Sequence, residues 1–106
     1  MPSSEDTEFF VLQAVAWQSE RGPVSREVVR EAVDFHQRIA LSDAELDGAL
    51  NRLQSAGRVV ARESGYAVAP TLAAALPRTK SGAVSTAVAP WQRLRARLAT
   101  TAAHDT

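Results

Sequence analysis

Apolar and polar positions follow the period of a helix in three segments of the first half of the chain. The first segment starts after Asp6 or Thr7 as N-cap, carries a wide apolar face, and ends at Gly22 and Pro23. A second helix is predicted after Ser25, which is a favourable N-cap residue. The apolar face of this second helix consists of Val28, Val29, Ala32, Val33 and Phe35.

The third helix has the strongest local signals. Ser42-Asp43-Ala44-Glu45 is a capping-box pattern, in which a hydroxyl and a carboxylate satisfy each other's free backbone amides. Gly57 is placed for a left-handed C-terminal cap. We therefore expect residues 43–56 to be helical, with Leu46, Ala49, Leu50 and Leu53 on the buried face at i, i+3, i+4 and i+7.

After Gly57 the period changes from 3.6 to 2. Residues 58–62 and 66–69 are two short β-type runs, and Gly65 between them suits a hairpin turn. Pro70 ends the hairpin, and Thr71 is a candidate N-cap for a short helix over residues 72–76. The pattern predicts a mainly α chain with a small β-hairpin, an α+β fold.

The rest of the chain divides into a linker and one more helix. Residues 1–77 form the predicted domain, and residues 78–90, rich in Thr, Ser, Gly, Ala and Val, are expected to be a surface linker. Residues 91–103 are predicted to be an amphipathic helix whose apolar stripe is Trp91, Leu94 and Leu98, with Ala102 one turn further on.

Composition restricts the class of protein. With 106 residues, 45% apolar and 23% charged, the chain suits one folded domain with tails. It contains no Cys, which excludes disulfides and thiolate metal sites and fits a reducing compartment. No apolar run approaches the ~20 residues of a membrane span, and the start lacks a signal-peptide pattern, so we expect a cytoplasmic protein without a membrane partner.

Charge is balanced overall but divided along the chain. Twelve basic and twelve acidic residues cancel, so no global field favours nucleic acid. Residues 1–57 nevertheless hold ten acids against five Arg, and residues 58–106 hold seven basic residues against two acids. The two halves can attract each other within one fold or across a symmetric pair.

The residues offer little for catalysis. The two histidines, His36 and His104, have no partner at metal-ligand spacing, and the five glycines are scattered singly. We therefore expect no metal, no cofactor and no enzymatic activity.

The order helix, short strand, helix, helix, hairpin resembles a winged helix-turn-helix. The likeness lies in residues 46–69, and above all in Leu50-Asn51-Arg52-Leu53-Gln54-Ser55-Ala56-Gly57-Arg58-Val59, which is similar to a pattern in many bacterial winged-helix regulators. This resemblance implies that the helix over 43–56 enters the DNA major groove while the hairpin, as the wing, touches the backbone. The implied groove-facing positions are Asp43, Glu45, Asp47, Gly48, Asn51 and Arg52.

Three of those positions depart from the family pattern. Asp43, Glu45 and Asp47 would bring carboxylates to phosphates, although their simplest role is to complement the helix dipole. We therefore favour a non-catalytic regulatory or adaptor module that acts through protein contacts, with these acids as a candidate partner surface. A DNA-binding transcriptional regulator is the alternative, with Asn51, Arg52, Arg58 and Arg62 as its candidate nucleic-acid contacts.

The last helix is too short to be stable by itself in water, so its apolar stripe of Trp91, Leu94 and Leu98 must be covered. It must dock onto the domain, pair with the same helix of a second chain, or meet a partner protein. We expect the segment to be helical with Trp91 mostly buried, and favour a homodimer contact. Arg93, Arg95 and Arg97 on the other faces are either solvated or available to an anionic surface.

Overall fold

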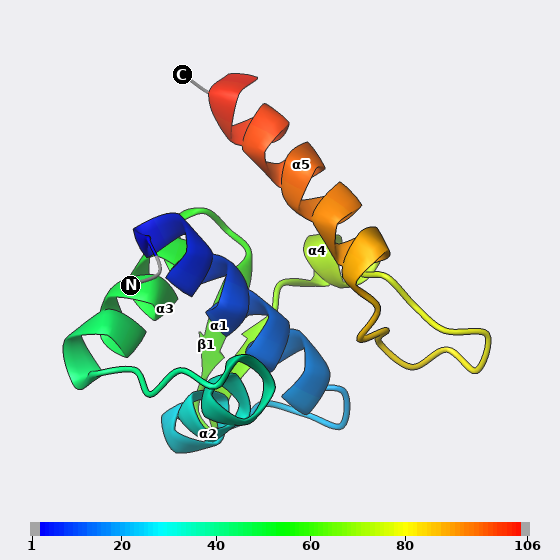
Figure 1. Cartoon of the computed structure of the whole chain (residues 1–106). Helices are drawn as coiled ribbons and strands as arrows, with labels where there is room; N and C mark the ends of the chain where they lie inside the picture. The colour runs from blue at the N-terminus through cyan, green and yellow to red at the C-terminus, as the bar shows by residue number, and fades with distance from the viewer. Residues whose placement is uncertain (1–2, 105–106) are drawn as a thin grey trace.

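The computed structural model describes the backbone of residues 3–104 and the side chains of residues 3–99. Over this range the chain forms five helices and one hairpin (Figure 1), which confirms the predicted mainly α fold with a small β element. Ala102 and the His104 side chain lie outside the described side chains. In chain order the elements are α1 (Ser4–Gln18), α2 (Arg26–Gln37), α3 (Asp43–Ser55), β1 (Val59–Arg62), β2 (Gly65–Val68), α4 (Pro70–Ala73) and α5 (Val88–His104).

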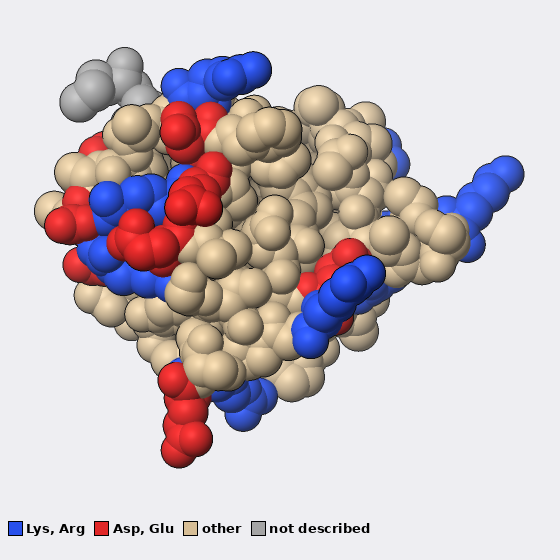
Figure 2. All heavy atoms as spheres, turned by 90° about the horizontal axis from the view of Figure 1, so that it is seen from below, with Lys and Arg blue, Asp and Glu red and all other residues tan. Residues whose placement is uncertain are grey.

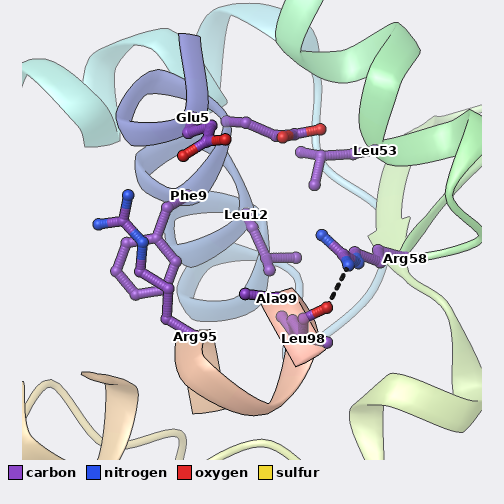
Figure 3. A pocket seen from close by; sticks show the side chains of 9 residues that line it. Glu5, Phe9, Leu12, Leu53, Arg58, Arg95, Leu98 and Ala99 are labelled. Atoms are coloured by element: carbon purple, nitrogen blue, oxygen red, sulfur yellow. Dashed lines mark hydrogen bonds between the residues drawn. The ribbon is translucent and has the colours of Figure 1, made fainter. Parts of the chain in front are cut away.

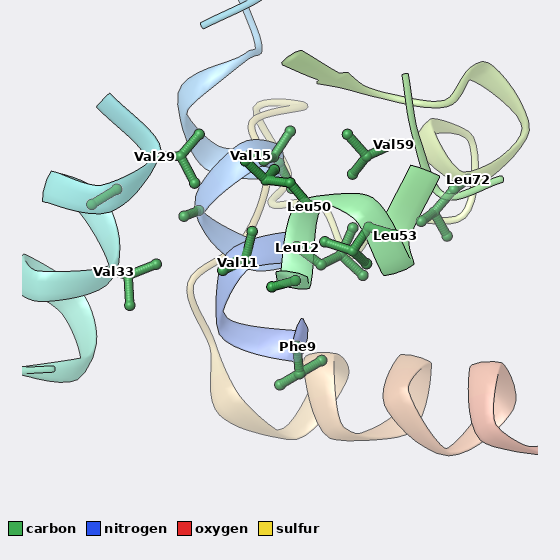
Figure 4. Close-up of a cluster of buried hydrophobic side chains, with 14 of the residues drawn as sticks. Phe9, Val11, Leu12, Val15, Val29, Val33, Leu50, Leu53, Val59 and Leu72 are labelled. Carbon is green, nitrogen blue, oxygen red and sulfur yellow. The ribbon is translucent and has the colours of Figure 1, made fainter. Parts of the chain in front are cut away.

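Helix α1 lies at the centre of the core. Its residues 11–16 are all buried, which is the pattern of a helix covered on every side. It packs against α2, α3 and β2. Figure 4 shows Leu12 and Val15 of α1 beside Leu50 and Leu53 of α3, with Val29 of α2 on the other side.

Local capping explains where the first three helices begin. The Ser25 and Ser42 hydroxyls accept from the backbone N–H of Val28 and Glu45, as the sequence predicts. The N-cap predicted for the first helix was wrong, because the Ser3 hydroxyl accepts from Asp6 N–H and the helix starts three residues earlier.

The end of α3 also follows its sequence signal. Gly57 has φ +73, its N–H donates to the Gln54 carbonyl, and the Arg58 N–H donates to the Leu53 carbonyl. This is a Schellman cap, which turns the chain directly from α3 into β1.

The hairpin pairs β1 with β2 antiparallel, from Val59 opposite Val68 to Arg62 opposite Gly65. Val24 joins the outer edge of β2 through a bridge to Tyr66, with N···O distances of 2.9 and 2.7 Å. Gly65 makes this approach feasible, because a Cβ there would lie 2.1 Å from the Val24 carbonyl oxygen. The hairpin is therefore fixed to the segment between α1 and α2.

The segment after the hairpin differs from prediction in two places. The short helix α4 begins with Pro70 at its first turn and has no side-chain cap, so Thr71 is not its N-cap. The predicted surface linker is only partly on the surface. A tight turn over residues 79–82 is exposed, but Val84 and Ser85 are buried, with Arg78 and Val84 forming a β-bridge.

Helix α5 starts beside α4 and runs past α1, so that its last turns project away from the rest of the fold (Figure 1). It begins at Val88, three residues before the predicted start. Trp91 is 1% exposed and Leu94 is buried with it, which confirms a docked helix. Among the described residues, none of the helices has the length and apolar character needed to cross a membrane.

Candidate functional site

The acidic side chains at the start of α3 meet two arginines from α2. The Arg26 guanidinium binds Asp47 through two bonds, Nε to Oδ1 at 2.6 Å and Nη2 to Oδ2 at 3.2 Å. Arg26 Nη2 also donates to Asp43 Oδ1 at 3.0 Å, and Arg30 Nη2 binds the same oxygen. With Glu27 beside Arg26 Nη1 at 3.2 Å, these five residues form what we call the α2–α3 network.

Protonation in the network follows from these contacts. Hydrogen bonds from Arg30 and then Arg26 hold the pKa of Asp43 below its ordinary value. Hydrogen bonds to Asp47 and Asp43 raise the pKa of Arg26. The network carries one net formal negative charge, since three carboxylates face two guanidinium groups. Figure 2 shows red and blue side chains side by side on the face that includes α2.

The structure brings only part of the predicted acidic surface together. Asp43 and Asp47 share Arg26, but Glu45 turns back to the N-terminus of its own helix. Glu45 Oε1 accepts from the Ser42 backbone N–H at 3.0 Å, and this bond lowers the pKa of Glu45. No sequence signal marks Arg26 and Arg30 as partners of these carboxylates, because helical periodicity does not fix how two helices cross.

The predicted nucleic-acid contacts divide into two pairs. Asn51 and Arg62 are exposed to solvent. Arg52 lies over Gly48, with its Nε 4.0 Å from Glu8 Oε1, although its side chain stays 46% exposed. Arg58 is half-buried and donates to the Leu98 carbonyl at 3.2 Å. Two of the four side chains are thus engaged by other parts of the fold.

The predicted docking stripe lies inside the chain. The Trp91 ring packs edge-on against Phe9 and Trp17, with centroid distances of 6.0 and 5.9 Å. Leu94 is buried, and Leu98 packs against the same core from its edge. A homodimer through this stripe would require the two chains to exchange α5.

Charge also ties α5 and the preceding turn to the N-terminal half. Arg95 Nη2 donates to Asp6 Oδ1 at 2.6 Å, and this bond is the main reason that the pKa of Asp6 lies below its ordinary value. Arg95 also stands 4.8 Å over the Phe9 ring. Arg78 pairs with Glu20 at 3.7 Å. Both ion pairs join the basic second half of the sequence to the acidic first half.

A small cavity lies where α5 crosses α1 and the start of β1 (Figure 3). Its volume is about 190 Å³, and its floor includes Leu12 and Leu53. Figure 3 shows the Arg58 guanidinium reaching across it to the Leu98 carbonyl, with Glu5 on the opposite side. Glu5 and Glu8 balance Arg58 and Arg95 around the cavity, so its walls have no net charge.

A second hollow is lined by aromatic side chains and opens beside the C-terminal end of α2. The centroids of the Trp17 and His36 rings lie 4.4 Å apart with the rings tilted by 46°, and Phe35 meets His36 edge-on at 5.1 Å. The hollow, which we call the aromatic groove, measures about 300 Å³. Its lining is Phe9, Phe10, Gln13, Trp17, His36, Gln37, Thr86, Val88, Trp91 and Gln92.

Phe35 corrects the predicted face of the second helix. It was expected in the core, but it is 72% exposed. The buried positions of α2 are Val29, Ala32 and Val33, and this spacing continues to His36 rather than to Phe35. The helical spacing alone could therefore have shown that Phe35 lies at the side of the apolar face.

The described residues contain no cluster of three or more His, Asp or Glu side chains that could hold a metal ion. Comparison of the chain with protein-family models, characterised proteins and solved structures finds no match.

Proposed function

We propose that this chain is a non-catalytic winged-helix module that acts as a regulatory or adaptor protein, through protein contacts and self-association. The winged-helix assignment is supported by the order of α1, α2, α3 and the hairpin. It is also supported by the Val24–Tyr66 bridge, which supplies the short strand between the first two helices on the outer edge of the wing.

The observation that carries the preference for protein contacts is the α2–α3 network. A helix that reads DNA offers donors to phosphates and base edges. Here the first two turns of α3 offer Asp43 and Asp47, and the nearest guanidinium groups are already bound to these carboxylates. To bind phosphate, Arg26 would have to give up a two-bond pair with Asp47 and leave that carboxylate beside the DNA.

DNA binding is the second candidate, and the same network gives it some support. Arg26 and Arg30 neutralise much of the charge on Asp43 and Asp47, so the repulsion of phosphate is weaker than three free carboxylates would produce. Asn51 and Arg62 are also exposed on α3 and at the end of β1.

Fluorescence anisotropy with a labelled duplex of randomised sequence separates these two functions. The unmodified chain should bind no tighter than roughly 10 μM at physiological salt, which is the range of sequence-independent association. Asp43→Asn combined with Asp47→Asn frees both arginines from their α3 partners and should tighten binding, with a steeper salt dependence. Glu5→Gln with Glu31→Gln removes two exposed acidic charges outside the network and is the matched control.

One result would reverse the order of the two candidates. That result is a duplex, selected from the randomised pool, that the chain binds at about nanomolar affinity, as specific regulators bind. If that affinity were then lost in Asn51→Ala or Arg52→Ala, the chain would be a DNA-binding regulator.

A further inference from the structure

We infer that two copies of this chain associate around a two-fold axis at the C-terminal end of α2, with Phe35 of each copy seated in the aromatic groove of the other. This inference rests on the self-association in the proposed function, and it names the surface. The surface is different from the Trp91, Leu94 and Leu98 stripe, which is covered within the chain.

The first step is the position of Phe35. An exposed apolar residue by itself is ordinary on a protein surface. Phe35 is 72% exposed, however, and Val88, which lines the aromatic groove, is equally exposed. Since His36 forms part of the groove and contacts the Phe35 ring, the protruding ring and the hollow belong to one surface.

The second step is the composition of the groove. Apart from His36, none of its lining side chains is ionisable, and its polar members are neutral Gln and Thr. The buried centres of protein interfaces have this composition, with aromatic residues enriched and charged residues depleted. The volume of about 300 Å³ exceeds the ~150 Å³ that holds a benzene molecule, so a phenyl side chain fits.

The third step is symmetry, which identifies the occupant as a second copy. A two-fold interface uses the same patch on both subunits, so it needs a protruding group and a matching hollow side by side. Asp34 and Arg38 add charge complementarity, since both are exposed and they flank Phe35 and His36 with opposite signs. An antiparallel crossing of two α2 ends brings Asp34 of each copy towards the oppositely charged Arg38 of the other.

Sedimentation velocity on the full chain tests the inference. A dimer that forms at concentrations up to about 100 μM is expected, and Phe35→Ala should weaken it by at least about tenfold. Glu31→Ala, one turn earlier on α2 and also exposed, is the matched control and should leave it intact. Because Phe35 is outside the core, its replacement should leave the melting temperature of the monomer unchanged.

A charge exchange tests the two-fold arrangement directly. Asp34→Arg places a positive charge opposite Arg38 of the other copy and should weaken the dimer. Adding Arg38→Asp restores opposite charges across the axis and should restore the dimer. Arg38 has φ +56, a conformation that Asp tolerates well, so the second change should not disturb the end of α2.

Three results would overturn the inference in distinguishable ways. A monomer at every concentration would overturn both this inference and the self-association in the proposed function. A dimer that persists in Phe35→Ala but is lost in Trp91→Ala with Leu94→Ala would place self-association at α5, and the proposed function would stand. Failure of the charge exchange to restore the dimer would exclude the two-fold crossing.

Discussion

Trp17 and Trp91 donate their indole N–H groups to the same acceptor, the backbone carbonyl of Ser85. The two N···O distances are 2.9 and 2.5 Å, and the rings cross at 76°. Residues from α1, α5 and the segment between α4 and α5 therefore meet at one oxygen. This shared bond explains why a stretch with a linker-like composition is held in the core.

Replacing Trp91 should release α5 from the rest of the fold. Trp91→Ala removes a fully buried ring and should lower the free energy of unfolding by about 3–5 kcal/mol. Trp91→Phe keeps an aromatic ring but loses the hydrogen bond, and should cost less, since Trp17 still satisfies the Ser85 carbonyl. Urea unfolding measures both. Equal stability of Trp91→Ala and the unmodified chain would contradict the docking of α5.

Two glycines with the same backbone angle provide a test of how the hairpin is attached to the segment before α2. Gly22 and Gly65 both have φ +139, but only at Gly65 would a Cβ meet backbone, at 2.1 Å from the Val24 carbonyl oxygen. Gly22→Ala should lower the free energy of unfolding by about 1–3 kcal/mol, because Ala is strained at this φ. Gly65→Ala should cost at least about 1 kcal/mol more, because the Val24–Tyr66 bridge must open. Thermal unfolding measures both variants. If they lose similar stability, the Val24–Tyr66 bridge contributes little to the stability of the fold.

The sequence predicts best those elements of the fold whose stabilising bonds join residues close together in the chain. Ser42 and Glu45 lie three positions apart, and their reciprocal bonds form as soon as the helix does. Gly57 is equally local. The hairpin was also predicted, but its turn is one residue shorter than expected, because Gly65 pairs with Arg62 and begins β2. The error in the predicted N-cap of the first helix is local too. Ser3 and Thr7 both precede helix-forming residues, and Ser3 is the one whose hydroxyl accepts from a backbone N–H of the first turn.

The capping box of α3 should be visible in acid unfolding. The pKa of Glu45 in the fold lies below its ordinary value of 4.5, mainly because its carboxylate accepts from the Ser42 backbone N–H. Glu45 therefore stabilises the fold above pH 4.5, and this contribution is lost as the pH falls through the folded-state pKa. The stability of Glu45→Gln should depend less on pH over this range, measured by urea unfolding at each pH.

Ser42→Ala is the companion variant for that measurement. It removes the hydroxyl that accepts from Glu45 N–H but leaves the carboxylate bond in place, so it should cost about 1 kcal/mol. Its stability should still fall with acid as in the unmodified chain. A pH profile of Glu45→Gln that matches the unmodified chain would show that this carboxylate does not stabilise α3.

The contact between Arg95 and Asp6 should be measurable at a single carboxyl group. Arg95→Met keeps most of the aliphatic packing over Phe9 but removes the hydrogen bond, so the pKa of Asp6 should rise. Carboxyl titration by NMR reads this directly. Arg93→Met, which changes an exposed residue of the same helix, should leave the Asp6 value where it is. If Arg95→Met has no effect, Arg95 does not hold α5 to α1 in solution.

What the sequence could not predict depends on how distant segments meet. Arg26 and Asp47 are 21 residues apart, and their pairing depends on the crossing of α2 and α3, which no periodicity encodes. The residues around Ser85 have the composition of a linker. The side chains that hold Ser85 belong to other elements, Trp17 on α1 and Trp91 on α5. Asn51 and Arg62 are candidates that rest on a resemblance, whereas the aromatic groove had no sequence motif and required the packed structure.

The exposed turn over residues 79–82 also gives this chain a chemical handle. Lys80 lies in that turn and is the only lysine of the sequence, so it carries the only side-chain amine for acylating reagents. It belongs to neither the aromatic groove nor the α2–α3 network. A dye or biotin attached there therefore leaves both surfaces chemically unaltered for binding measurements.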